Sequence, residues 1–205
     1  MLKKVVLVSA LVFANSFADG VFIGLSAGGA LSGISEDSFV NMSGVWLDNE
    51  LADDDKSLNA LTYGAKVGYD AKFNDTHGLK AYVDYSRASF NGGSDLAKDL
   101  TYDIITLNAD YHYYFMPELS VFGGLSLGNA WADTKGLYGK ENALGYGVNV
   151  GLDYDISEHF EVEAKFRYFD PNFKEKAFEI QPNQSIKKVE PDDFSQILLG
   201  VNFTF

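Results

Sequence analysis

Histidine supplies most acid–base chemistry near neutral pH, and this chain of 205 residues contains three, His77, His112 and His159. His112 follows Asp110 by two residues in a segment of alternating polarity, so both side chains should point to the same side of a strand. Such a pair could act as a general base with a carboxylate partner. The same spacing is common in a polar core, and we expect that role for both residues.

A run of three carboxylates, Asp53, Asp54 and Asp55, is the second group with chemical potential. Carboxylate oxygens are preferred ligands of calcium and magnesium, so the run could chelate a divalent cation. It lacks the spaced ligands and the glycine of a dedicated calcium loop, which favours a solvated acidic loop. The chain has no cysteine, which excludes disulfides, thiolate metal sites and cysteine nucleophiles. We predict no cofactor, no metal site and no enzymatic activity.

These residues lie in or between eight segments in which apolar and polar side chains alternate, the pattern of strands. No position of the apolar rows carries a charge. The segments span residues 21–31, 61–71, 79–85, 105–115, 119–127, 144–154, 160–168 and 197–205.

The opposite faces collect the charge. They are rich in glycine, and aromatic residues gather at the ends of the apolar rows. A secreted β-sandwich or a lipocalin-like soluble barrel would also alternate, but with its apolar face inward. The glycine-rich polar face and the aromatic row ends favour lipid outside and a polar lumen inside. The predicted lumen residues are Lys66, Asp70, Lys72, Lys80, Asp84, Asp110, His112, Asp153, Glu161, Glu163, Lys165 and Arg167.

The lumen charges nearly cancel, so we expect them to form ion pairs. A symmetric turn between the second and third segments would place Lys66 opposite Asp84 and Asp70 opposite Lys80. A self-neutralised lumen of eight strands is a plug more than a selective pore, because side chains can fill it. A polar core that serves folding is therefore favoured over a gate that exchanges ion-pair partners.

The links between segments alternate between short and long. Links at 73–78, 116–118 and 155–159 are short, whereas 32–60 and 170–193 are the longest. Short periplasmic turns and long extracellular loops are typical of outer-membrane barrels, and an even strand number puts both termini in the periplasm. The first long link also carries Phe39, Val45, Trp46 and Leu47, which could form an adhesive patch or a lid over the barrel mouth.

The N-terminus has the layout of a secretory signal. Lys3 and Lys4 precede an apolar run at 5–13, and a small-x-small site at 16–18 follows. We therefore predict a signal peptide at 1–18 and a single barrel domain at 19–205. The apolar run is too short for a membrane-spanning helix, and a net charge of -13 argues against a nucleic-acid partner.

The last segment alternates to the final residue, with an apolar row of Ile197, Leu199, Val201, Phe203 and Phe205. This strand resembles the closing strand of Gram-negative outer-membrane β-barrels, in which the terminal Phe and the alternating apolar residues are read by the assembly machinery. With eight segments, the chain looks like the small OmpA/OmpX-type family, also grouped as porin-family or outer-membrane β-barrel proteins. The fold that this resemblance implies is all-β, an eight-stranded antiparallel up-and-down transmembrane barrel.

The resemblance also sets expectations for function. It implies a monomer in the Gram-negative outer membrane, in contact with lipid and lipopolysaccharide, that supports envelope integrity and uses its loops for adhesion or host contact. Phe39, Trp46 and Asp53 to Asp55 are the candidate contact residues. Lipid-modifying and proteolytic barrels use His with Ser, Asp or Glu near the outer rim, where we expect none of the three histidines. The alternatives are a narrow gated channel for small solutes and, less favoured, a lipid-modifying enzyme.

Overall fold

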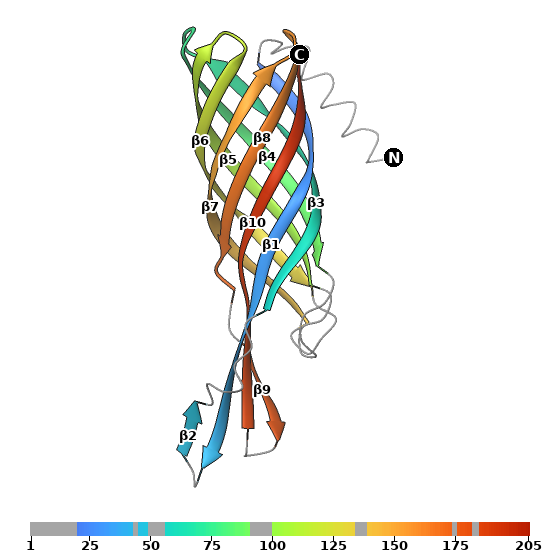
Figure 1. The fold of residues 1–205 in the computed structure, drawn as a ribbon, viewed down its shortest axis with the longest axis vertical. Helices are drawn as coiled ribbons and strands as arrows, with labels where there is room; N and C mark the ends of the chain where they lie inside the picture. Colours follow the sequence, from blue (N-terminus) through green and yellow to red (C-terminus); the bar gives the residue numbers. More distant parts are fainter. Residues whose placement is uncertain are drawn as a thin grey trace, which may run out of the picture.

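The computed structural model describes residues 20–42, 45–48, 56–90, 100–133, 139–173, 176–181 and 185–205. The chain forms an antiparallel sheet that closes into a barrel (Figure 1). Eight strands build the wall in the order β1, β3, β4, β5, β6, β7, β8 and β10, and β10 pairs with β1. The predicted eight-stranded barrel is confirmed. The strands are β1 (Val21–Met42), β2 (Val45–Asp48), β3 (Lys56–Lys72), β4 (His77–Phe90), β5 (Thr101–Met116), β6 (Leu119–Asp133), β7 (Lys140–Asp155), β8 (Phe160–Pro171), β9 (Lys176–Gln181) and β10 (Ser185–Thr204).

The wall alternates as its sequence does. Leu61 is 73% exposed on the outside, whereas the next residue, Thr62, is fully buried inside. The same alternation runs along β4, β5 and β7. The outer surface is therefore apolar, the reverse of a soluble barrel. Among the described residues there is no helix long and apolar enough to cross a membrane.

The two ends of the barrel differ in their connections. At one end, which we call the turn end, residues 73–76, 117–118 and 156–159 join the strands. The first of these turns is closed by Asn74, whose Oδ1 accepts hydrogen bonds from the backbone N–H of Thr76 at 2.8 Å and of His77 at 2.9 Å. The other end, the loop end, has longer links such as residues 91–100.

Two strands continue beyond the barrel at the loop end, where loops were expected. Residues Ile34 to Val40 of β1 pair with Pro191 to Ser185 of β10, after a register shift between Ser32 and Ile34. β2 then pairs with β1, and β9 pairs with β10. We call these four paired segments the outer sheet; they project away from the barrel in Figure 1. The links at 32–60 and 170–193, expected as long loops, therefore contain strand at 32–42, 45–48, 56–60, 170–171, 176–181 and 185–193.

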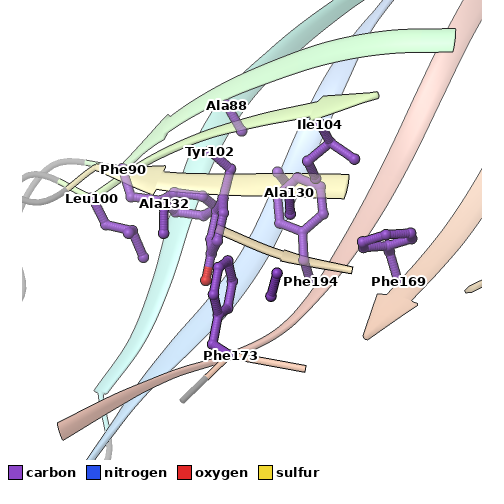
Figure 2. Packing of buried hydrophobic residues seen from close by; sticks show 12 residues of the cluster. Ala88, Phe90, Leu100, Tyr102, Ile104, Ala130, Ala132, Phe169, Phe173 and Phe194 are labelled. Atoms are coloured by element: carbon purple, nitrogen blue, oxygen red, sulfur yellow. The ribbon is translucent and has the colours of Figure 1, made fainter. Parts of the chain in front are cut away.

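The interior has two layers. The half toward the loop end is filled by an apolar plug, shown in Figure 2, in which rings from different walls meet. Ring centroids lie 5.3 Å apart for Tyr102 and Phe194 and 5.8 Å apart for Tyr102 and Phe173. The half toward the turn end holds the charged residues. The plug consists of Ala30, Ala88, Phe90, Leu100, Tyr102, Ile104, Ala130, Ala132, Ala143, Phe169, Phe173 and Phe194.

Candidate functional site: the barrel interior

The charged layer begins with five buried residues that we call the central cluster. Lys66 of β3 donates to Glu163 of β8, with Nζ 2.5 Å from Oε2. Lys165 Nζ lies 3.2 Å from Glu163 Oε1. Arg167 donates to Asp84 of β4 at 2.9 Å. All five side chains are at most 2% exposed, so their charges must be compensated within the barrel.

The strand register agrees with the predicted one, but one of the two predicted ion pairs, Lys66–Asp84, does not form. Lys66 stands opposite Asp84, and Asp70 opposite Lys80. Lys66 instead reaches across the lumen to Glu163, and Asp84 bonds Arg167. The barrel is narrow enough for a lysine to span it, so the far wall competes with the neighbouring strand.

A second group, the turn-end cluster, surrounds Lys80 of β4. Its Nζ lies 2.5 Å from Glu161, 2.7 Å from Asp153 and 3.9 Å from Asp70. The predicted Asp70–Lys80 pair is thus present as the longest of three contacts. Three carboxylates share one ammonium group, so this cluster carries an excess of negative charge.

His112 and Asp110 do not form the base-and-partner arrangement that their spacing could allow. Asp110 accepts hydrogen bonds from Tyr82 Oη at 2.6 Å and from Asn149 Nδ2 at 3.0 Å. His112 Nδ1 lies 3.2 Å from Ser120 Oγ and 3.4 Å from Asp153. Its ring stacks on Phe122, 4.9 Å between centroids. Both residues lie within the packed polar layer.

Two polar residues that we did not single out, Tyr82 and Asn149, support the central cluster. Tyr82 supports Asp110, and its ring lies 5.1 Å from Lys66 Nζ and 5.2 Å from Lys165 Nζ. Asn149 accepts from Arg167 Nε at 3.2 Å. Both residues occupy the inward parity of their strands. We predicted only charged residues and a histidine for the lumen, so these two residues were missed.

Lys72 lies at the mouth of the turn end, and its side chain is half exposed. Its Nζ pairs with Asp155 at 3.2 Å and lies 4.5 Å from the centre of the Tyr114 ring. A cavity of about 700 Å³ opens beside this pair. We call it the vestibule. It is lined by Gly20, Tyr69, Asp70, Ala71, Lys72, Pro117, Glu118, Asp155, Ile156, Ser157, Glu158, Glu161 and Thr204.

The other candidates that the structure describes lie outside the lumen. Ile197, Leu199 and Val201 are exposed on the outer wall, and Phe203 packs against Phe160 and Phe205. In the backbone register of the outer sheet, Phe39 stands opposite Asp48, and Trp46 stands opposite Asn41. Residues 1–18 and 53–55 fall outside the described residues. Within the described ranges, no three His, Asp or Glu residues are grouped to hold a metal ion.

The closed barrel with its apolar exterior and polar interior agrees with the comparison to known families. Residues 5–205 match the family described as outer membrane protein beta-barrel domain. The chain belongs to this outer-membrane β-barrel family. No curated protein matches the sequence.

Solved members of this type of barrel share the fold at low sequence identity. Neisserial surface protein A is 19% identical, with a TM-score of 0.55, and the match covers 91% of this chain and 98% of that protein. OprG from Pseudomonas aeruginosa is 17% identical, with a TM-score of 0.54 and coverage of 92% and 97%. AlkL, solved in lipid bilayers, is 17% identical, with a TM-score of 0.52 and coverage of 91% and 92%. The chain is therefore an outer-membrane β-barrel, although identities this low show only a common fold.

Proposed function

We propose that this barrel is a sealed, non-enzymatic protein of the Gram-negative outer membrane whose outer sheet contacts a partner outside the cell. The observation that carries the proposal is the continuation of β1 and β10 past the barrel, where β2 and β9 join them. A barrel that served only as a membrane scaffold would need only short links at this end.

The outer sheet is suited to contact because both of its edges are open. In the described part of the chain, β2 pairs only with β1, and β9 pairs only with β10. Each edge therefore presents backbone N–H and C=O groups to the surroundings. Such edges recruit extended segments of other proteins by β-strand addition.

The interior supports a sealed barrel, because two barriers stand in series. A solute that entered from the loop end would meet the apolar plug, in which Tyr102 and Phe169 are fully buried. It would then meet the central cluster, whose side chains bond across the lumen. The second candidate function is a narrow gated channel. The buried ion pairs are the observation that favours it, because their exchange could open a path.

The positions of the histidines support a non-enzymatic role. His77 Nδ1 lies 2.6 Å from Tyr111 Oη, and His159 Nδ1 lies 3.0 Å from the carbonyl oxygen of Thr204, both at the turn end. His112 is buried between Phe122 and Tyr114. A catalytic histidine acting on lipid at the outer leaflet would belong at the loop end.

The proposed orientation places the turn end and both termini in the periplasm and the loop end outside the cell. Short periplasmic turns and longer outer loops are usual for such barrels. The exposed apolar row of β10, Ile197, Leu199 and Val201, would contact lipid and present the signal to the assembly machinery. In this position the protein also contributes to the integrity of the envelope, alongside lipopolysaccharide.

Removal of the outer sheet tests the contact role. Ile34 stands opposite Lys56, so a two-residue Asn-Gly turn can replace residues 35–55 and close a hairpin. A short turn can likewise replace residues 174–190. Gram-negative cells that display the full chain should adhere to an epithelial monolayer in larger numbers than cells that display the shortened barrel. Equal adherence, with equal surface amounts of both proteins, would overturn the proposed contact role.

A further inference from the structure

The vestibule at the turn end is strongly acidic. Five of its lining residues are carboxylates: Asp70, Glu118, Asp155, Glu158 and Glu161. Lys72 is the cationic side chain among the lining residues. The volume of the vestibule, about 700 Å³, is in the usual range for small-molecule sites.

The inner end of the vestibule carries charge that the barrel does not neutralise. Asp70 and Glu161 belong both to the vestibule and to the turn-end cluster around Lys80. Asp153 completes that cluster, so one ammonium group faces three carboxylates. In the central cluster, by contrast, three cations meet two carboxylates, and Tyr82 links Lys165 to Asp110. Buried uncompensated charge is costly, so the turn-end cluster favours uptake of a proton or of another cation.

Unpartnered polar atoms lie at the same end of the barrel. The Tyr114 hydroxyl has no hydrogen-bond partner, and Tyr114 is only 5% exposed. Its ring lies 4.5 Å from the Nζ atom of Lys72, which lines the vestibule. Asp153 Oδ1 and Asp70 Oδ1 also lack partners, and the Asp153 side chain is 2% exposed. Of these three residues, Asp70 lines the vestibule, and an N–H donor of a ligand there would satisfy its Oδ1 atom.

We propose that the vestibule binds a small linear polyamine, in which ammonium groups are separated by methylene chains. One ammonium would lie near Asp70 and Glu161, and another near the outer carboxylates Glu118, Asp155 and Glu158. The apolar lining from Tyr69, Pro117 and Ile156 would contact the methylene groups. A bare divalent metal ion fits less well, because the described residues offer no grouped set of three ligands and the cavity is far larger than an ion.

The site is blind and independent of the outer sheet. The central cluster and the apolar plug close its inner end, so the ligand would enter and leave through the turn end. In the proposed orientation that end faces the periplasm. Failure of polyamine binding would leave the proposed contact role of the outer sheet untouched.

Titration of the refolded full chain with spermidine tests this inference. The protein is placed in nanodiscs of zwitterionic phospholipid at low ionic strength, and heat release is measured. We expect one spermidine per barrel. Because rim carboxylates give modest contributions, Glu158→Gln should weaken binding by about three- to fivefold, and Asp155→Asn with Glu158→Gln by about tenfold or more. Lys72→Gln should tighten binding by about threefold, a gain that misfolding would not produce.

Asp75→Asn is the matched control, because Asp75 is an exposed carboxylate of the first short turn that does not line the vestibule. It should leave the affinity unchanged. Three results would overturn the inference: absence of binding by the wild-type chain, equal weakening by Asp75→Asn and Glu158→Gln, or displacement of spermidine by Mg²⁺ at equal charge concentration. Mobility on unheated gels confirms that each variant is folded.

Discussion

The ion pairs of the lumen show which properties of a single residue can be predicted from the sequence. Every one of the twelve predicted lumen residues lies on the inward parity of its strand, and Lys72 alone among them is exposed at the mouth. The alternating pattern tells on which face of the strand a side chain lies, but not which partner a long side chain will contact. The partner of Lys66 was therefore missed, because Glu163 on the opposite wall is in reach of its long side chain.

Loss of Arg167 should destabilise the barrel strongly. Arg167→Met leaves Asp84 buried without its closest cation, which typically costs about 3–5 kcal/mol of unfolding free energy. Urea unfolding of the refolded protein, followed by tryptophan fluorescence, measures the change. Arg87→Met is the control, because Arg87 lies at the exposed rim, 3.6 Å from Asp103, and should change little. Equal effects of the two substitutions would contradict the proposed packing of the lumen.

A glycine that makes room for an aromatic ring gives a second residue-level prediction. A Cβ on Gly151 would clash with the backbone oxygen of Ala164 and would lie 2.5 Å from Cζ of Phe122, which stands opposite it on β6. Gly151→Ala should therefore cost about 1–3 kcal/mol through overpacking. Gly123 is the next residue on β6, and a Cβ there would meet nothing within 4 Å. Gly123→Ala should change the unfolding free energy by less than about 0.5 kcal/mol. Similar urea midpoints for the two variants would contradict this close packing around Gly151.

At the scale of the strands, the sequence was informative wherever one face meets lipid and the other faces the lumen. The eight rows that form the wall alternate for this reason, and all were found. The outer sheet was missed because this constraint does not apply beyond the barrel. β1 continues to Met42 and β9 forms at Lys176–Gln181 in segments where no row of alternating polarity stood out.

The lipid-facing rows predict that the free-energy cost of introducing a charge depends on its depth in the membrane. Leu199 lies midway along the wall part of β10, 69% exposed, and pairs with Ala27 and Ala164. Leu199→Arg should cost about 2–4 kcal/mol in a bilayer, because a cation at mid-depth is poorly solvated. Leu31→Arg, nearer the loop end of β1, should cost only about 0–1 kcal/mol. The measurement is reversible unfolding from phospholipid vesicles. A larger cost at Leu31 would indicate that the membrane boundaries are misplaced.

For the whole molecule, closure of the barrel could be predicted, but the division of its interior into an apolar and a charged layer could not. The predicted eight-stranded barrel requires its last strand to pair with its first, and Phe22 does stand opposite Thr204. The apolar plug was not expected, because its residues come from inward positions near or beyond the ends of the rows, such as Phe90, Leu100 and Phe194. Scattered along the sequence, they form one layer only after the barrel closes.

Single-channel recording in a planar bilayer tests the sealed barrel most directly. The refolded full chain is inserted and its current is followed over time at a steady voltage. The two barriers in series predict insertion without stable, discrete conductance steps, because neither the apolar plug nor the central cluster leaves a continuous aqueous path. Reproducible steps of fixed size from the folded wild-type protein would contradict the account and favour the gated channel.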